Sequence, residues 1–305
     1  MEPKIGIIGM GAIGLLFGSE LADKYGSDNI FFIADPDRIE RYKNEEITVN
    51  GEKKEFSFAA PDEAPEVDLL IFAVKNYSLG DALKNAANAC GRDTIVVSFM
   101  NGITSEDEIA ASLHPYHLLY STVQGMDATR DGYKLEYTTP GSVTIGEKSN
   151  TRSEALDKAV KILSDAGIKT EVPDDIIHSM WSKWMLNCGV NQACAIAECG
   201  YGGVQKGGIA RLAMLNAMDE ARMLANLEGI EITEDEQNEW LDLIETLDPD
   251  KEPSMRQDTK AGRPTEVECF AGLVKKLGQK HKVGTPMNDN LYTTLTVDHV
   301  RSTDY

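Results

Sequence analysis

A lysine and two asparagines interrupt an otherwise mostly apolar stretch, WSKWMLNCGVNQ, at residues 181–192. Lys183, Asn187 and Asn191 recur at intervals of four, so a helix would place all three on one face within an arc of about 80°. Burying an ammonium group and two amides without partners is costly. The stripe therefore serves a function, or else the lysine head reaches solvent while the asparagines bind neighbouring backbone.

Two further polar residues lie later in the chain. Glu266 stands near the start of the stretch TEVECFAGLVKKLGQK. In a helix over this stretch it would share a face with Phe270, Leu273 and Leu277. A carboxylate at the head of an apolar stripe is paired, lies at a pocket, or favours the dipole of the helix N-terminus. Ser254 begins SMRQ, a capping-box pattern, so composition alone favours a helix-capping role for it.

The N-terminal stretch carries a dinucleotide-binding pattern. Gly9-Met10-Gly11-Ala12-Ile13-Gly14 is a GxGxxG that follows an apolar run and opens the helical stretch AIGLLFGSELADKY. The first glycine allows a tight turn, the second lets the backbone approach the pyrophosphate, and the third lets the helix pack on the strand. The N–H groups of the helix start would face the phosphates. The alternative is a glycine-rich turn that binds no ligand.

The ends of the following apolar runs hold the remaining candidate cofactor residues. Asp35 lies about 20 residues after Gly14, where an acidic residue bonds the ribose 2′-hydroxyl and favours NAD over NADP. Arg38 could instead accept a 2′-phosphate, and Asp35 could simply cap a helix. Lys75 and Asn101 end the next two runs, at the edge where open α/β sheets bind ligands. Their alternatives are a loop lysine and an Asn-Gly turn.

A lysine, a carboxylate, amides and a serine, combined with a nicotinamide site, suggest the reduction of a carbonyl group. Hydride addition to the carbonyl carbon leaves a developing alkoxide, which needs a proton and electrostatic stabilisation. A lysine whose pKa is lowered by burial supplies both, which favours Lys183 as the proton donor. Neutral amides such as those of Asn187 and Asn191 would orient an oxo acid without adding charge.

These residues require two kinds of scaffold. Strands are predicted at 4–10, 29–35, 67–74, 94–100, 118–125 and 142–147. The near-continuous apolar runs among them, alternating with helices, indicate a doubly wound, mostly parallel Rossmann sheet. Beyond about residue 175 the periodicity is helical throughout. We therefore expect an α/β dinucleotide-binding domain over 1–174 and an all-α substrate and catalytic domain over 175–305.

Composition limits the classes of partner. The 305 residues carry a net charge of −20, which argues against nucleic acid and anionic membranes, although a small anionic substrate could bind in a locally positive pocket. Five cysteines without a CxxC pair argue against a metal site and fit a cytoplasmic protein. No apolar run approaches the roughly 20 residues that a membrane span needs.

The chain resembles the ketopantoate reductase (2-dehydropantoate 2-reductase) family over essentially its whole length. The likeness is carried by IGIIGMGAIG, VKNY, MNG, DDIIHSMWSKWMLNCGVNQ and SMRQDTKAGRPTEVECFAG, of which the last two are distinctive. The resemblance implies an NADPH-dependent reduction of ketopantoate to pantoate in pantothenate synthesis. It also implies a Rossmann domain joined to a helical domain like that of 6-phosphogluconate dehydrogenase, in a monomer or homodimer.

The resemblance also assigns roles by position. It implies that Lys183 is the general acid and that Glu266 is the active-site glutamate, which bonds substrate or lysine. Substrate-contacting positions of the family match Asn187, Asn191 and Ser254, and cleft-lining positions match Lys75 and Asn101.

Two positions depart from the family pattern. Asp35 stands where the family usually has an arginine for the NADP 2′-phosphate, so NAD(H) is favoured unless Arg38 substitutes for it. Tyr201 stands where a family asparagine contacts substrate. The alternative activity is therefore a D-2-hydroxyacid dehydrogenase of the same fold, acting on another branched or aromatic 2-oxo acid. The alternative of another class is a catalytically silent nucleotide-binding sensor.

Overall fold

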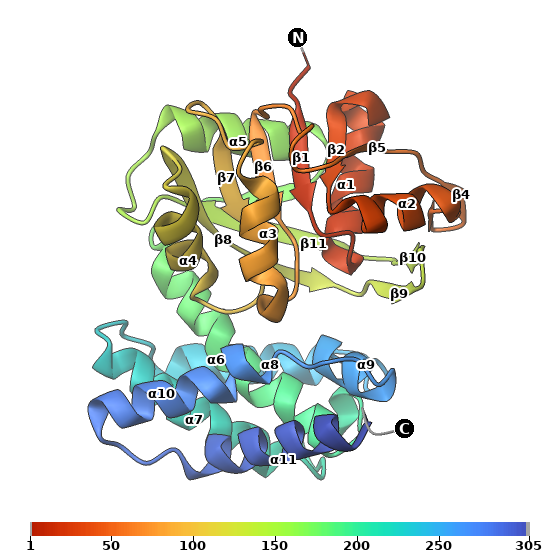
Figure 1. Cartoon of the computed structure of the whole chain (residues 1–305). Coiled ribbons are helices and arrows are strands. Elements are labelled where there is room, and N and C mark those ends of the chain that lie inside the picture. Colours follow the sequence, from red (N-terminus) through yellow and green to blue (C-terminus); the bar gives the residue numbers. More distant parts are fainter. Residues whose placement is uncertain (1, 303–305) are drawn as a thin grey trace. The chain divides into compact units, whose positions relative to one another are not determined.

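The chain falls into two compact units that divide between Ile176 and Ile177. Figure 1 shows the computed structural model, which describes residues 2–302 and the side chains of residues 2–296. The first unit is a sheet flanked by helices, and the second consists of helices. Among the described residues, none of the helices combines the length and the apolar character that crossing a membrane requires.

The first unit is built on an eight-stranded sheet in the order β12-β11-β8-β7-β6-β1-β2-β5. The strands are β1 Ile5–Ile8, β2 Ile30–Ile33, β5 Ser57–Ala59, β6 Leu69–Phe72, β7 Ile95–Ser98, β8 His117–Met126, β11 Pro140–Gly146 and β12 Lys169–Glu171. Six strands that are consecutive in the sheet, β8-β7-β6-β1-β2-β5, pair in parallel, while β11 is antiparallel to β8. This confirms the predicted mostly parallel sheet.

Helices cover both faces of this sheet. They are α1 Ala12–Tyr25, α2 Pro36–Asn44, α3 Leu79–Ala86, α4 Ser105–Leu113 and α5 Glu154–Asp165. In β1, Ile7 packs with α1 and α5, whereas its neighbour Ile8 packs with α3 and α4, which lie on the near face in Figure 1. In β6, Ile71 and Phe72 divide in the same way. Burial on both faces explains why the central strands are apolar throughout.

A second, four-stranded sheet lies in the same unit, in the order β4-β3-β10-β9. Its strands are β3 Thr48–Val49, β4 Glu52–Lys53, β9 Thr129–Asp131 and β10 Lys134–Glu136. These strands were not predicted from the sequence. Segments of two or three residues, several of them polar and exposed, are too short to show the alternation that marks a strand.

The second unit is helical over its described residues, 177–302, as predicted. Its helices are α6 Ile176–Ile196, α7 Arg211–Leu227, α8 Glu234–Thr246, α9 Ser254–Lys260, α10 Ala271–His281 and α11 Pro286–Ser302, with 3-10 turns η3 Tyr201–Gly203 and η4 Val267–Cys269. The tryptophans of the chain lie here. The rings of Trp181 and Trp184 meet edge to face at 5.3 Å on α6, and Trp240 of α8 donates its indole N–H to Ser182.

The continuous helix expected over residues 265–280 is interrupted. Glu266 precedes the 3-10 turn η4, and Phe270 has a non-helical backbone (φ −109°, ψ −97°) before α10 begins at Ala271. Glu266 therefore does not share a helical face with Leu273 and Leu277, so that prediction was wrong. Its burial has another cause.

The capping role that composition favoured for Ser254 was also wrong. Ser254 is the first helical residue of α9, Pro253 occupies the N-cap position, and the N-cap residue makes no side-chain cap. The Met255 N–H of the first turn donates instead to Asn191 Oδ1 at 3.5 Å. The capping box of the second unit lies instead at α8, where Thr233 and Glu236 each bond the other's backbone N–H. The Ser254 hydroxyl is therefore available for another contact.

Candidate active site

The turn between β1 and α1 accounts for each of its three glycines. Gly9 has a φ of +108°, and a Cβ there would lie 2.6 Å from the carbonyl oxygen of Ala73. A Cβ on Gly14 would lie 1.9 Å from the carbonyl oxygen of Gly9. A Cβ on Gly11 would have the carbonyl oxygen of Ala73 as its nearest neighbour, at 3.8 Å. The fold itself requires glycine at positions 9 and 14, whereas the open space at Gly11 suits the close approach of a ligand.

The same turn presents the N-terminus of α1. Gly11 is the N-cap residue of α1 and makes no side-chain cap. The N–H groups of Ala12 and Ile13 are therefore not bonded by a capping side chain. Such N–H groups, with the positive end of the helix dipole, form a binding site for phosphate. The stretch from Gly9 to Gly14 therefore fits the pyrophosphate of a dinucleotide.

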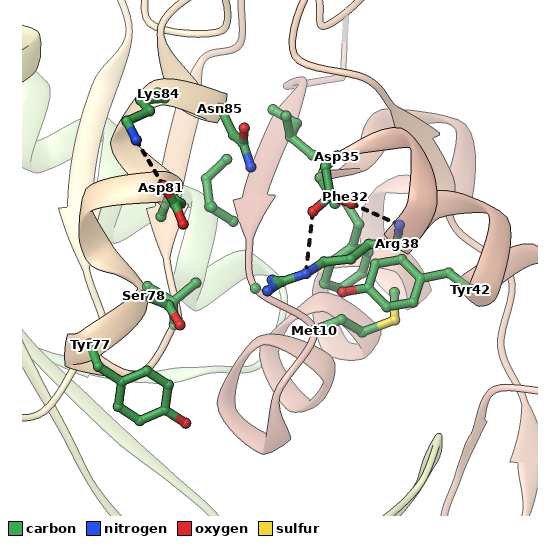
Figure 2. Close-up of a pocket in the computed structure, with 16 residues that line it drawn as sticks. Met10, Phe32, Asp35, Arg38, Tyr42, Tyr77, Ser78, Asp81, Lys84 and Asn85 are labelled. Atoms are coloured by element: carbon green, nitrogen blue, oxygen red, sulfur yellow. Dashed lines mark hydrogen bonds and ion pairs between the residues drawn. The ribbon is translucent and has the colours of Figure 1, made fainter. Parts of the chain in front are cut away.

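A cavity of about 270 Å³ opens beside this turn, at the carboxyl ends of β1, β2 and β6 (Figure 2). This is the edge at which doubly wound sheets bind nucleotides. The cofactor residues predicted from the sequence that line it are Gly9, Met10, Asp35 and Arg38. Lining residues that were not predicted from the sequence include Phe32, Tyr42, Tyr77, Ser78, Asp81, Lys84 and Asn85. Several of the latter belong to α3. This helix follows the strand that ends near Lys75, so the position of that strand was the signal that could have indicated them.

Asp35 both caps α2 and faces the cavity. Its Oδ1 accepts a hydrogen bond from the Arg38 N–H at 2.9 Å, and its Oδ2 lies 3.3 Å from the Arg38 Nε (Figure 2). The helix-cap alternative is therefore correct for Asp35. It is compatible with a ribose contact, because a carboxylate has further acceptor sites. Both side chains are nearly half exposed, so their ion pair contributes only about 0–1 kcal/mol and does not fix Arg38.

Lys75 and Asn101 lie at the ends of β6 and β7 but do not line this cavity. Lys75 precedes the 3-10 turn η2 (Asn76–Ser78) and is half-buried, so it is not an exposed loop lysine. Asn101 is also half-buried, and it precedes Gly102, whose left-handed backbone (φ +103°) fits the alternative of an Asn-Gly turn.

The polar stripe predicted from the sequence lies on α6 and is buried. The exposed fractions are 9% for Lys183, 9% for Asn187 and 5% for Asn191. The Asn191 side-chain amide donates to Asn187 Oδ1 at 3.0 Å. Asn191 Oδ1 accepts from the Ser254 hydroxyl at 3.4 Å, which links the stripe to the start of α9. Asn187, Asn191 and Ser254 therefore form a connected polar cluster, and the whole stripe, Lys183 included, is buried rather than solvated.

Glu266 acts on Lys183 within this cluster, and its exposed fraction is 5%. Burial lowers the pKa of Lys183 to about 8, while the negative charge of the Glu266 carboxylate acts in the opposite direction. An amine with a pKa of about 8 remains protonated at neutral pH and still gives up its proton readily. The pair of Lys183 and Glu266 therefore has the electrostatics of a proton donor.

The described residues show no sign of a metal centre. Within them, no group of three or more His, Cys, Asp or Glu side chains is arranged to hold an ion. The five cysteines are free thiols.

Two family models match this chain. One, described as Ketopantoate reductase PanE/ApbA, matches residues 5–150, and the other, its C-terminal counterpart, matches residues 175–298. The chain belongs to the ketopantoate reductase family. It is therefore an oxidoreductase of a family with a nicotinamide-binding Rossmann fold.

Relatives of this family are similar over almost their whole length. The chain is 29% identical to a 2-dehydropantoate 2-reductase of Pyrococcus horikoshii over 290 residues, which cover 93% of this chain and 94% of that protein. It is 24% identical to the protein of that name from Streptococcus pyogenes, over 92% of both chains.

Solved structures share the fold. A PanE/ApbA family ketopantoate reductase from Ralstonia eutropha superposes with a TM-score of 0.84 at 22% identity, over 98% of this chain and 99% of that one. A D-mandelate dehydrogenase in complex with NADH superposes with a TM-score of 0.87 at 24% identity, over the same shares. At these identities the likeness shows the fold and leaves the substrate open.

Proposed function

We propose that this chain is a 2-dehydropantoate 2-reductase, which reduces the 2-oxo group of ketopantoate to the hydroxyl group of pantoate during pantothenate synthesis. Residues 1–174 would bind the cofactor, and residues 175–305 would carry the catalytic groups. The observation that supports this most directly is the buried Lys183 with Glu266 acting on it, in a polar cluster with Asn187 and Asn191. The relatives of this name support the choice of substrate.

The proposed chemistry divides between a hydride donor and a proton donor. A reduced nicotinamide, when bound, supplies the hydride to C2 of the oxo acid. Lys183 gives its proton to the carbonyl oxygen while negative charge develops there, and its own positive charge stabilises that oxygen. Glu266 holds the ammonium group, and Asn187 and Asn191 bind the substrate through neutral hydrogen bonds. Ser254 and Asn101 are the further substrate contacts in this proposal.

Replacement of Lys183 tests the proton donor. Lys183→Ala should lower kcat by about 10²–10⁴-fold, the usual contribution of a general acid, and leave cofactor affinity unchanged because Lys183 does not line the cofactor cavity. Steady-state kinetics with ketopantoate and a cofactor titration measure the two effects. Lys276→Ala, which removes an exposed lysine of α10, is the control. Normal turnover by Lys183→Ala would rule out the assigned role.

For the cofactor, we propose that NADH is preferred over NADPH, although the family is usually NADPH-dependent. The Asp35 carboxylate lies at the cavity end of β2, where a ribose 2′-hydroxyl would donate to it and a 2′-phosphate would be repelled. Parallel assays of kcat/KM with the two cofactors measure the preference. Asp35→Asn keeps a good helix cap and removes the negative charge, so it should reduce the ratio of kcat/KM with NADH to kcat/KM with NADPH. A strong NADPH preference of the native chain would contradict the proposal.

Tyr201 favours a second candidate, a D-2-hydroxyacid dehydrogenase that acts on a branched or aromatic 2-oxo acid. It occupies the position of a family asparagine, at the start of η3, and its N–H donates to the carbonyl of Lys251 at 2.9 Å. Burial raises the pKa of Tyr201 to about 12, so the phenol stays neutral. Ratios of kcat/KM for ketopantoate and phenylglyoxylate separate the two activities. Cofactor binding without turnover of any 2-oxo acid would favour the sensor instead.

A further inference from the structure

The break at Phe270 places the carbonyl of Cys269 and the N–H of Ala271 outside the hydrogen-bond ladder of α10. The first bond of that helix runs from the Val274 N–H to the carbonyl of Phe270. The carbonyl of Cys269 and the N–H of Ala271 therefore lie before the ladder, in a buried segment. Buried backbone groups of this kind need partners from elsewhere, since each unpaired group costs about 1–3 kcal/mol.

Both partners come from side chains of α6. The indole N–H of Trp184 donates to the Cys269 carbonyl at 2.8 Å, and the Ala271 N–H donates to Gln192 Oε1 at 3.1 Å. Trp184 is 1% exposed and Gln192 is 0% exposed. The two bonds hold the segment from Glu266 to Ala271, named here the Glu266 turn, on α6.

The two α6 residues follow the catalytic stripe by one position. Trp184 comes directly after Lys183, and Gln192 directly after Asn191. One residue corresponds to about 100° around a helix, so α6 presents the catalytic stripe on one face and the contacts to the Glu266 turn on the adjacent face. The same helix thus carries the proton donor and holds the residue that acts on it.

The orientation of the Gln192 amide is fixed by its other bonds. Its Nε2 donates to the Cys188 carbonyl at 2.6 Å and to Asn288 Oδ1 at 3.3 Å. Asn288 is itself oriented, because its Nδ2 donates to Glu220 Oε2 at 2.7 Å. With the amide nitrogen committed to these acceptors, the oxygen must point at the Ala271 N–H. Such a supporting set of bonds is the usual means by which a functional side chain is held in place.

We propose that Trp184 and Gln192 are positioning residues, which hold the Glu266 turn on α6 and so keep the Glu266 carboxylate beside the Lys183 ammonium group. Their effect on turnover rests on the proposed function, whereas their effect on the Lys183–Glu266 pair does not.

Loosening of the Glu266 turn has a defined electrostatic consequence. The Glu266 carboxylate, which belongs to this turn, raises the pKa of Lys183 against the effect of its burial. When the turn moves away, Lys183 loses this negative partner and keeps most of its burial in α6. The pKa of Lys183 should then fall further, and less of the lysine is protonated at neutral pH.

The test removes one holding bond at a time. Trp184→Phe removes the indole N–H, and Gln192→Met removes the amide while keeping the length of the side chain. Trp240→Phe is the matched control, because its indole N–H donates at 2.8 Å to Ser182 of the same helix and makes no bond to the Glu266 turn. The readouts are the pH profile of kcat/KM, and ¹³C NMR titration of Lys183 in lysine-labelled protein, with Lys183→Arg to assign the signal.

Both test variants should lower kcat about 10- to 100-fold, as small displacements of catalytic groups do, with the cofactor KM unchanged. In both, the Lys183 titration and the basic limb of the pH profile should move to lower pH by about half a unit or more, in the same direction as in Glu266→Gln. Trp240→Phe should leave both curves in place.

The proposal fails if the folded variants, checked by near-UV circular dichroism, titrate like the native chain, because Trp184 and Gln192 then contribute stability alone. Since each variant removes a different bond, either one that folds decides the question. A native chain that turns over no 2-oxo acid overturns the proposed function, whereas the NMR titration still decides the positioning role.

Discussion

At the scale of single residues, burial makes Lys183 sensitive to pH in the range where enzymes are assayed. Its pKa is lowered to about 8, so protonation is complete at pH 6 and largely lost by pH 10. If Lys183 donates the proton, kcat/KM should be level in the acidic range and fall as the pH rises through about 8. A pH–rate profile with saturating cofactor measures this. A profile that stays level up to pH 10 would contradict the assignment.

A second buried acid, Glu106, lies in the first unit and takes no part in the proposed chemistry. It is 1% exposed, and Ser105 donates its hydroxyl to Glu106 Oε2 at 2.9 Å. Desolvation raises the pKa of Glu106 from 4.5 to about 7. The folded chain therefore retains a proton that the unfolded chain has already lost over this range.

This difference predicts the pH dependence of stability. The contribution of Glu106 to the free energy of unfolding is greatest below pH 4.5 and is lost as the pH rises to about 7, a change on the order of 1–3 kcal/mol. The free energy of unfolding of Glu106→Gln, taken relative to that of the native chain, should therefore be higher at pH 8 than at pH 5. Urea unfolding at both values measures the difference. Glu108→Gln, an exposed change on the same helix, should show none.

At the scale of elements, the β1–α1 turn separates what the fold needs from what the ligand needs. Gly14→Ala would place a Cβ 1.9 Å from the Gly9 carbonyl, so it should destabilise the first unit by several kcal/mol. Gly11→Ala meets no protein atom closer than 3.8 Å and should fold normally, but bind NADH at least about tenfold more weakly. Thermal unfolding and cofactor titration of the two variants test this pair. Tight binding by Gly11→Ala would mean that the cofactor lies elsewhere.

Elements defined by local pattern were predicted well. The helix expected over AIGLLFGSELADKY has those residues as its bounds, and β1, β2, β6 and β7 lie within the apolar runs that predicted them. The break at Phe270 could not be predicted. The backbone groups on either side of it bond Trp184 and Gln192, which are 85 and 79 residues away, and no local pattern encodes such bonds.

The candidate site shows the same division. The spacing of Lys183, Asn187 and Asn191 predicted their common face, because that face is a property of one helix. Ser254 fits a capping-box pattern, yet the helix starts one residue earlier than that role requires, at Pro253 as the N-cap. The α3 wall of the cofactor cavity was missed, because its residues meet Asp35 and Arg38 only through the pairing of strands β2, β1 and β6.

At the scale of the whole molecule, the net charge of −20 opposes the binding of an anionic cofactor and an anionic oxo acid. The cations at the cavity are paired, Arg38 with Asp35 and Lys84 with Asp81 (Figure 2). Salt screens the long-range repulsion, with a Debye length of about 10 Å at 0.1 M. Raising NaCl from about 20 to 200 mM should therefore lower the KM for NADH severalfold. Sucrose of equal osmolarity is the control, and an unchanged or rising KM would contradict the argument.

The three tryptophans, Trp181, Trp184 and Trp240, all lie in the second unit. Tryptophan fluorescence therefore reports on the helical unit alone, because the sheet unit contains no tryptophan. Far-UV circular dichroism records both units. Unfolding curves from the two signals coincide only where the units melt together. The placement of these side chains thus gives an optical assay for the order in which the two halves of the chain come apart, with no label added.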